Sequence, residues 1–271
     1  MRPRRSTFAA DYISDAVEQY AACTEVFKSG APFDYEELKW SHDVLSQYFA
    51  VVSGPHIIER TRKRFASIPP PSQPTSGYVP YLRNIDTPSP VDIVQLEALA
   101  YRRRSVRWFL PAPVEKEKID RALRVAGLSP SACNRQPYFF RIYDKRELIQ
   151  EILRLPGGVG GYASNVPNLA VIVGQLRNFA HERDRHLIYI DSSLAAMSFL
   201  FALEAQEIAS CCINWPDIAE RERQMSSILG LSPDERPIML IALGYPDPAG
   251  MVPHSVKKVL DSIRSYNQMR T

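Results

Sequence analysis

The sequence predicts an α+β protein, and three observations lead to that expectation. Apolar residues at helical spacing dominate the first 66 residues. From about residue 115 onward, short apolar runs typical of buried strands alternate loosely with helical segments. No Gly-x-Gly-x-x-Gly motif follows the first predicted strand, so a doubly wound dinucleotide-binding domain is not indicated.

Length and composition set the broad class of the protein. With 271 residues and a hydrophobic fraction of 45%, the chain can form one large domain, or one domain plus an extension, around a real core. A net charge of +3 is too small to indicate a nucleic-acid partner. No run approaches the roughly 18 uncharged apolar residues that a membrane span requires. We therefore expect no nucleic acid and no membrane among its partners.

The N-terminus and the cysteines indicate a cytoplasmic protein. Residues 1–20 begin with basic side chains but lack the apolar core and the cleavage site of an export signal. None of the cysteines forms a Cys-x-x-Cys pair or lies at zinc-finger spacing from histidines, and reduced thiols are the simplest interpretation. The stretch HERDRH, residues 181–186, is more typical of a solvated loop than of a metal site, so we predict no bound metal. The cysteines are Cys23, Cys133, Cys211 and Cys212.

Three helices followed by a proline-rich linker are predicted for the N-terminal part. The helices are expected at residues 8–29, 34–52 and 56–66, separated by breaks that contain glycine and proline. The stretch SIPPPSQPTSGYVP, residues 67–80, has too many prolines for a helix and indicates an extended linker. We therefore divide the chain into two parts. These are a helical extension with its linker, residues 1–95, and a second domain, residues 96–271.

The second domain is predicted to contain both helices and strands. Strands are expected at residues 138–143, 168–174, 209–215 and 237–246, and helices at residues 115–127, 145–155 and 191–205. In the first of these helices, Ile119, Leu123 and Ala126 mark the buried face. The last helix, DSSLAAMSFLFALEA, is expected to be capped by Asp191 and is apolar around most of its circumference. Such a helix should be buried on all sides, in a core or in a subunit interface.

A basic segment, RRRSVRWF at residues 102–109, is the first candidate for function. Arg103, Ser105 and Arg107 alternate, so in an extended segment their side chains would point the same way. Two guanidinium groups and a hydroxyl on one face suit a phosphate, because guanidinium forms bidentate, charge-assisted hydrogen bonds. For these residues alone, an ordinary basic surface turn is the alternative interpretation.

A polar loop, SPSACNRQP at residues 129–137, is the second candidate. Prolines fix both of its ends, and the backbone between them is free to bond the edge of a ligand. Asn134 and Gln136 can each donate and accept hydrogen bonds, and Ser131 adds a small polar side chain. The alternative is a polar helix end that leads into a strand.

Together these motifs resemble the nitroreductase family of FMN-dependent oxidoreductases. That family opens with an Arg-x-Ser-x-Arg/Lys segment and has a Pro-Ser-x-x-Asn-x-Gln-Pro loop, as residues 103–107 and 130–137 do here. The later order is also similar, with the strand NLAVIVG, the helix DSSLAAMSFLFALEA, the strand IASCCIN and a strand that ends in Gly-Tyr-Pro. Over residues 96–262, the resemblance implies a mixed sheet flanked by helices in an intertwined homodimer. The helical N-terminal extension lies outside it.

The resemblance implies a set of cofactor contacts at a dimer interface. Those near the FMN phosphate and ribityl chain would be Arg103, Arg104 (mainly through its backbone), Ser105, Arg107 and Lys257. Those from the partner subunit would be Pro130, Ser131, Ala132, Asn134 and, nearby, Gln136. Those along the isoalloxazine ring would be Asn165 and the backbone of Ile213 and Asn214.

The implied chemistry is centred on the flavin, and we assign no general acid or base. NADH or NADPH would deliver hydride, leave, and be replaced on the same open face by a small-molecule acceptor, a ping-pong mechanism that needs no Rossmann motif. Nitro compounds, quinones, enones and a biosynthetic intermediate are all compatible acceptors. Two alternatives remain open: a degenerate flavin-fold protein that binds a partner without turnover, and a basic adaptor that acts through the N-terminal helices. Ser255 stands where many relatives have a second tail cation, which favours the degenerate protein.

Overall fold

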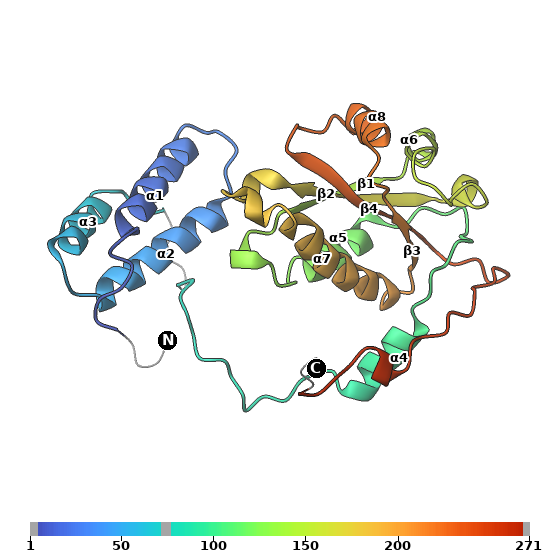
Figure 1. The fold of residues 1–271 in the computed structure, drawn as a ribbon, viewed down its shortest axis with the longest axis horizontal. Coiled ribbons are helices and arrows are strands. Elements are labelled where there is room, and N and C mark those ends of the chain that lie inside the picture. Colours follow the sequence, from blue (N-terminus) through green and yellow to red (C-terminus); the bar gives the residue numbers. More distant parts are fainter. Residues whose placement is uncertain (1–4, 72–76, 268–271) are drawn as a thin grey trace. The chain divides into compact units, whose positions relative to one another are not determined.

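The computed structural model describes residues 5–71 and 77–267, and the chain divides into two compact units, residues 1–88 and 89–271 (Figure 1). The first unit contains α1 (Ile13–Lys28), α2 (Tyr35–Val51) and α3 (His56–Ala66), close to the three predicted helices. Their apolar faces pack into one core, and Asp34 caps α2 by accepting a hydrogen bond from the backbone N–H of Glu36. The predicted linker includes residues 72–76, which lie outside the described residues.

The second unit begins with a helix that was not predicted from the sequence, α4 (Ile93–Arg102). Asp92 and Gln95 form a capping box, in which each side chain accepts a hydrogen bond from the backbone N–H of the other residue. The boundary predicted between residues 95 and 96 therefore falls inside α4, because this cap starts the helix at Ile93. Along the sequence, the first compact unit ends at Pro88 and the second begins at Ser89.

A four-stranded antiparallel sheet forms the centre of the second unit. Its order is β1-β2-β4-β3, with β1 (Tyr138–Tyr143), β2 (Asn168–Gln175), β3 (Ala209–Asn214) and β4 (Glu235–Gly244). The α+β class is confirmed. The parallel component of the predicted mixed sheet is limited, among the described residues, to an isolated bridge between Ser105 and Ser210.

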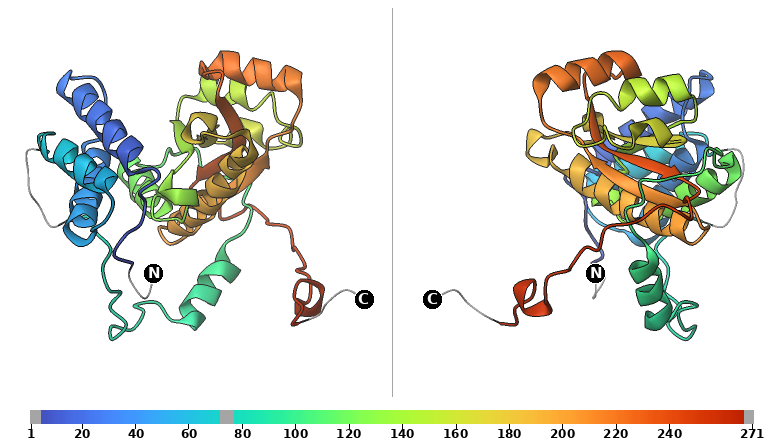
Figure 2. Two further views of the ribbon diagram at one scale, coloured as in Figure 1. Left: turned by 60° about the vertical axis from the view of Figure 1, so that its left-hand side comes forward. Right: turned by 90° about the vertical axis from the view of Figure 1, so that its right-hand side faces the viewer.

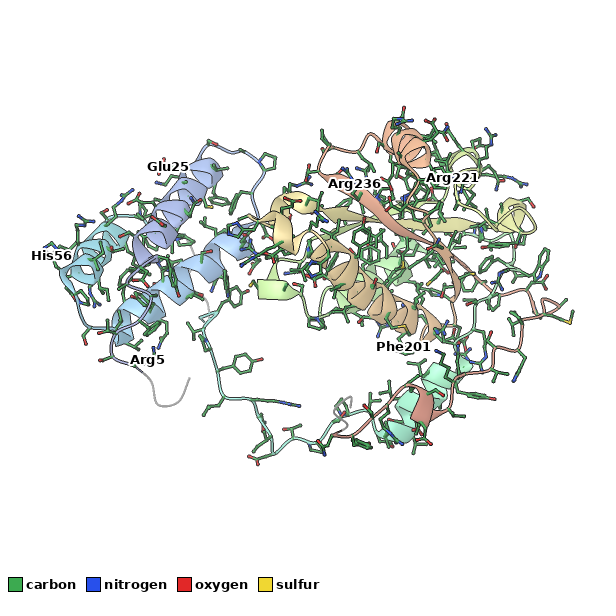
Figure 3. The ribbon with its side chains drawn as sticks, viewed as in Figure 1. Arg5, Glu25, His56, Phe201, Arg221 and Arg236 are labelled. Carbon is green, nitrogen blue, oxygen red and sulfur yellow. The ribbon has the colours of Figure 1, made fainter. Side chains whose placement is uncertain are left out.

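Helices cover both faces of this sheet (Figure 2). The helices α6 (Arg146–Ile152) and α8 (Ala219–Leu229) pack on one face, and α5 (Lys116–Ala126) and α7 (Leu187–Glu204) pack on the other. On β2, Leu169 and Val171 point into the first core and Ala170 and Ile172 into the second, so the strand is buried up to its last residue, Gln175. This explains why the strand has a continuous apolar run and not an alternating pattern. Figure 3 shows the side chains on the ribbon, including those between the sheet and the helices on its two faces.

The helix α7 differs from its prediction in two respects. It begins at Leu187, because the apolar residues before Asp191 continue the helix, so the predicted N-cap role of Asp191 is wrong. Asp191 lies inside the helix and is only 2% exposed. The helix is also not buried on all sides within this chain, since Tyr189 is 50% exposed and Leu194 is 42% exposed. Whether a second subunit covers that face stays a prediction.

The extra length of α7 bears on the membrane expectation. Within the described residues, the segment Glu182–Glu204 is long and apolar enough to cross a membrane, by length and composition only. Half of the apolar window is buried inside the fold, and a core helix meets the same criterion. Asp191 interrupts this segment, so it is not the uncharged run that a membrane span was expected to require, and the membrane expectation stays a prediction. The structure uses α7 as a core helix, packed on the sheet.

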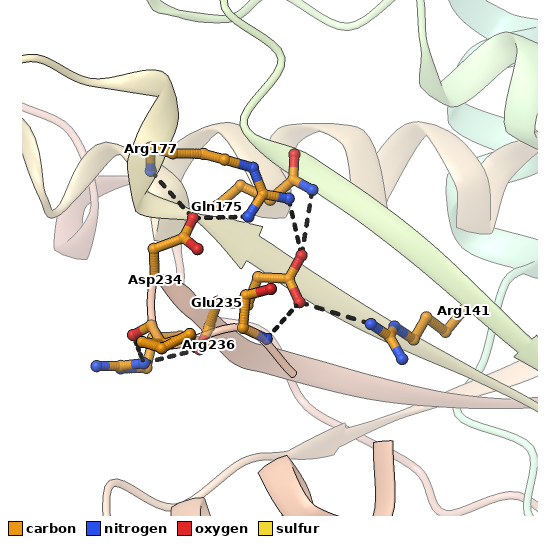
Figure 4. A network of polar contacts seen from close by, with 8 residues as sticks. Arg141, Gln175, Arg177, Asp234, Glu235 and Arg236 are labelled. Carbon is orange, nitrogen blue, oxygen red and sulfur yellow. Dashed lines mark hydrogen bonds and ion pairs between the residues drawn. The ribbon is translucent and has the colours of Figure 1, made fainter. Parts of the chain in front are cut away.

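A polar network links β1 to the start of β4 and to the residues that follow β2 (Figure 4). Glu235 accepts hydrogen bonds from Arg177 at 2.8 Å and from the backbone N–H of Ser232 at 3.1 Å, and lies 3.5 Å from Arg141. Arg177 also donates to Asp234 at 2.7 Å. Because Arg141 further donates to the backbone carbonyl at the end of α8, the network fixes β1, β4 and α8 relative to one another.

Candidate functional site

The basic segment after α4 runs beside β3. Ser105 forms the isolated bridge to Ser210, and the N–H of Val106 donates to the carbonyl of Ser210 at 3.0 Å. Val106 packs against the core, and its N–H also lies 3.1 Å from the carbonyl of Arg104, so the segment tightens at Ser105. That Ser105 and Arg107 share one face stays a prediction. Among the described residues, neither Arg103 nor Arg107 has an acidic partner within ion-pair distance. Two half-buried guanidinium groups therefore remain available to an anion.

The neighbouring arginines are used differently. The guanidinium of Arg102 donates to the backbone carbonyl of Glu204 at 3.1 Å and pairs with its carboxylate at 3.4 Å. That of Arg104 stacks on Tyr101, 4.6 Å from the ring centroid, and donates to the carbonyl of Arg103 at 2.9 Å. Among the described residues, Arg103 and Arg107 are thus the arginines of this segment whose guanidiniums make no hydrogen bond to a backbone carbonyl, and their role at a ligand stays a prediction.

Asn165 fastens this segment to the core. Its amide donates to the backbone carbonyls of Arg107 and Tyr162, both at 2.8 Å, and its oxygen accepts from the N–H of Phe109 at 2.8 Å. The family resemblance implies that this side chain lies at the isoalloxazine edge. Both of its N–H donors are used within the chain, so toward a ligand it has only acceptor capacity left.

Tyr162 is a neighbour of Arg107 that sequence reasoning did not select. The guanidinium carbon of Arg107 lies 5.8 Å from the centroid of the Tyr162 ring. Burial, and then the nearby Cys211, raise the pKa of Tyr162 to about 12, while Arg107 acts in the opposite direction. The phenol therefore stays protonated at neutral pH and cannot act as a base. The only signal in the sequence is its place at the end of the glycine-rich stretch PGGVGGY.

The strand β3 is one of the two edge strands of the sheet, and it lies next to the basic segment. Ile213 is buried, whereas Asn214 is exposed. One side of β3 pairs with β4, and beyond the bridge at Ser210 its other side forms no further strand pair in the described part of the chain. The backbone around Ile213 and Asn214 can therefore face a ligand held by the basic segment.

The polar loop has an unusual backbone. Cys133, Asn134 and Gln136 have φ angles of 52°, 54° and 45°, in the left-handed region that residues with a Cβ seldom adopt. The N–H of Gln136 donates to Oγ of Ser131 at 3.0 Å, and the N–H of Ala132 donates to Oδ2 of Asp191 at 3.0 Å. The loop thus exposes the Asn134 and Gln136 side chains on a fixed and strained backbone.

The two candidate motifs do not meet within one chain. The loop is held at Asp191, in the first half of α7, whereas Arg102 is held at Glu204, where α7 ends. Thirteen residues of helix, from 191 to 204, separate these anchor points by about 20 Å at 1.5 Å per residue. The loop at Ala132 and the basic segment at Arg102 are therefore held at different parts of α7, although the first residue of the loop, Ser129, bonds Ser198 nearer the middle of the helix.

The C-terminal tail, which contains Lys257, extends away from the sheet (Figure 2). Lys257 is exposed and makes no hydrogen bond or ion pair with any described residue. The structure therefore does not bring Lys257 to the basic segment of its own chain. Elsewhere, no group of three or more His, Cys, Asp or Glu side chains within residues 5–71 and 77–267 is arranged to hold a metal ion.

Comparison with known proteins decides the family. The model of the nitroreductase family matches residues 100–157 and 164–245, more than half of the chain. The chain belongs to the nitroreductase family. An iodotyrosine deiodinase of Hydra vulgaris is 25% identical over 186 residues, which are 59% of this chain and 68% of that protein.

Solved structures agree on the fold. A nitroreductase family protein from Streptococcus pneumoniae is 22% identical and superposes with a TM-score of 0.53, covering 64% of this chain and 100% of that one. An FMN-dependent nitroreductase from Clostridium difficile is also 22% identical, with a TM-score of 0.50, and covers 64% of this chain and 96% of that one.

For a nitroreductase-family chain, the position of the match matters. Both candidate motifs lie inside it, at residues 103–107 and 130–136, and so do Asn165 and the backbone around Ile213. The first compact unit and Lys257 lie outside it. Family membership supports an oxidoreductase, and its relatives include proteins named for more than one reaction.

Proposed function

We propose that this nitroreductase-family chain is an FMN-dependent oxidoreductase whose second unit binds the flavin. The observation that supports this most directly is the basic segment itself. Arg103, Ser105 and Arg107 come from one short stretch that is bridged to β3 at Ser105, and the two guanidiniums have no acidic partner among the described residues. Such a group of donors fits a phosphate and the hydroxyls next to it. Asn165 holds the backbone of this stretch in place.

The complete site is proposed to need two copies of the chain. The loop of Pro130, Ser131, Ala132, Asn134 and Gln136 lies near the far end of α7 from the basic segment, so a second copy is the natural source of the loop at each site. The exposed apolar face of α7, which includes Tyr189 and Leu194, supports such an assembly, because contiguous apolar surface favours a protein partner. Lys257, in a tail that extends from its own body, would reach the phosphate in the same assembly.

When FMN is bound, it supplies the hydride-transfer chemistry. The chain's own residues bind and orient it: the basic segment at the phosphate, Arg104 through its backbone, and the backbone of Ile213 and Asn214 along the ring. Tyr162 stays protonated, so we assign it a packing role beside Arg107. We propose NADH or NADPH as the reductant, a nitro compound, quinone or biosynthetic intermediate as the acceptor, and a cytoplasmic location.

The first test is an absorption spectrum of the purified protein, before and after anaerobic addition of NADPH. Oxidised-flavin bands that bleach on addition would support the reductase. Bands that persist would show that the protein binds flavin but that NADPH does not reduce it. NADH would then be tested in the same way. A colourless protein that does not take up added FMN would contradict the proposal and favour the binding-protein alternative.

Two substitutions locate the phosphate site. We expect Arg103→Ala and Arg107→Ala each to weaken FMN binding at least about tenfold, because each removes a charge-assisted contact. Arg102→Ala is the matched control, since that neighbouring arginine bonds Glu204 and faces no proposed ligand. Equal affinity in all three variants would place the phosphate elsewhere. An adaptor protein would keep its partner in all of them.

The deiodinase relatives favour a second candidate reaction, reductive removal of halogen from a halogenated phenol. The test uses protein whose flavin has been reduced anaerobically with dithionite, mixed separately with 3-iodotyrosine, a nitroaromatic compound and a quinone. Release of iodide with reoxidation of the flavin by iodotyrosine alone would favour the dehalogenase. Reoxidation only by the other two acceptors would favour the nitro or quinone reductase.

A further inference from the structure

Asp191 is a buried acidic residue inside a core helix. It is 2% exposed, and it lies within α7 and not at the N-cap, a position that His186 occupies. Aspartate is a poor residue for a helix interior, and a buried carboxylate is costly unless it is hydrogen-bonded. Its Oδ2 accepts a hydrogen bond from the N–H of Ala132 at 3.0 Å. This bond is therefore the feature that accounts for an acid at this position.

The bond connects α7 to the strained part of the polar loop. Ala132 immediately precedes Cys133 and Asn134, whose φ angles are 52° and 54°; this region is costly above all for Cys133, since asparagine adopts it more readily. A backbone in this region persists only when its surroundings hold it there. Other anchors lie on either side of the strained pair. Before it, Oγ of Ser129 donates to Oγ of Ser198 at 2.7 Å.

The anchor after the strained pair is a reciprocal one. Arg135 donates to the carbonyl of Asn178 at 2.8 Å, and the amide of Asn178 donates back to the carbonyl of Arg135 at 2.8 Å. Among the described residues, Asp191 is the side chain outside the loop that bonds it between these two anchors. It therefore acts where the backbone turns into the left-handed region.

We infer that Asp191 is a positioning residue, which holds the loop in the conformation that presents Asn134 and Gln136 to the ligand. The inference rests on the proposed function for the identity of that ligand, FMN. The side-chain oxygen supplies the acceptor that the N–H of Ala132 needs at this point of the loop. A rigid loop would also lose less conformational freedom on binding.

The test compares Asp191→Ala, Asp191→Asn and Ser192→Ala in the full-length protein. Hydrogen exchange of loop peptides is measured by mass spectrometry without flavin, and FMN affinity is measured by fluorescence titration. In Asp191→Ala we expect exchange at least about tenfold faster and FMN binding about tenfold weaker, because the bond that anchors the loop at Ala132 is lost. Asp191→Asn keeps an oxygen that can accept from Ala132 and should recover most of both. Ser192→Ala alters a buried neighbour with no bond to the loop and should match the wild type.

Contrary results separate the role of Asp191 from the identity of the ligand. Unchanged loop exchange in Asp191→Ala would overturn the inference, and so would faster exchange with unchanged FMN affinity. If wild-type protein takes up no FMN, the proposed function fails, while the flavin-free exchange comparison still decides whether Asp191 orders the loop. If Asp191→Ala does not fold, Asp191→Leu, which fills the space without an acceptor, takes its place in the same comparison.

Discussion

Among single residues, Asn165 illustrates how one amide organises a segment that is distant in sequence. It bonds the backbone on both sides of Trp108 and also the carbonyl of Tyr162. Backbone groups that are partly shielded from water need such partners, because an unpaired polar group is costly. The basic segment is therefore held in position by the side chain of Asn165, which is far away in sequence and contacts the segment only in the folded state.

We expect Asn165→Ala to lower the free energy of unfolding by about 2–3 kcal/mol, because three backbone groups lose their partners. Urea denaturation followed by circular dichroism measures the change. Ser164→Ala is the matched control, an exposed neighbour whose replacement should change the value by less than about 0.5 kcal/mol. Equal stability of the two variants would contradict the structural role of Asn165.

Between elements, α7 and β2 approach closely at a glycine. A Cβ added to Gly174 would lie 2.7 Å from Cδ1 of Ile238 and 2.9 Å from Cβ of Ile188. Ile188 belongs to the first turn of α7, so this glycine allows the helix to lie close to the sheet. The absence of a side chain at Gly174 is thus part of how the two elements pack.

Gly174→Ala should destabilise the fold by about 1–3 kcal/mol, because the added methyl group overpacks the contact between α7 and β2. Thermal unfolding detects this as a lower melting temperature. Gly160→Ala provides the comparison, since a Cβ there meets no atom within 4 Å. A melting temperature lowered as much by Gly160→Ala would show that the effect does not come from packing.

The polar network around Glu235 makes the free energy of unfolding depend on pH. Burial raises the pKa of Glu235, but hydrogen bonds from Arg177, the N–H of Ser232 and Gln175 outweigh it, so the pKa lies below its ordinary value of 4.5. A carboxyl whose pKa is lowered on folding stabilises the protein above its unfolded pKa, and this contribution is lost as the pH falls through the folded pKa.

We therefore expect Glu235→Gln to be less stable than wild type by about 1–3 kcal/mol at pH 7, because Arg177 and Arg141 lose a charged partner. This difference should shrink as the pH falls below the ordinary value of 4.5. Urea midpoints measured between neutral and acidic pH give the comparison. Glu151→Gln, at an exposed carboxyl without an ion-pair partner in the described structure, should show no such trend. A difference that stays constant with pH would contradict this account.

In the molecule as a whole, much apolar surface remains exposed on the second unit. The outer face of α7 exposes Tyr189 and Leu194, and α4 has no buried residue. The C-terminal tail exposes Met251 and Val256, and both α4 and the tail extend away from the sheet (Figure 2). Apolar surface on this scale favours association, which agrees with the proposal that each site takes residues from two copies.

Leu194→Glu should shift the protein toward monomers, because it places a charge in the proposed interface, and should weaken FMN binding in parallel. Size-exclusion chromatography with light scattering measures the mass. Leu148→Glu is a control of similar exposure, 38% against 42%, on α6 at the other face of the sheet. A wild-type protein that is monomeric and still binds FMN tightly would contradict the two-copy site.

Apolar periodicity along the chain was enough to predict the α+β class, most helices and all four strands, because it records which faces are buried. Residue types and their order also indicated the two motifs, since both resemble one family. The role of Asp191, the bonds of Asn165 and the distance between the motifs emerged only in the folded chain. They depend on contacts between residues far apart in sequence, such as Ala132 with Asp191, and no local pattern encodes such contacts. For that reason only the folded chain shows that Asp191 lies in the core and bonds the loop at Ala132.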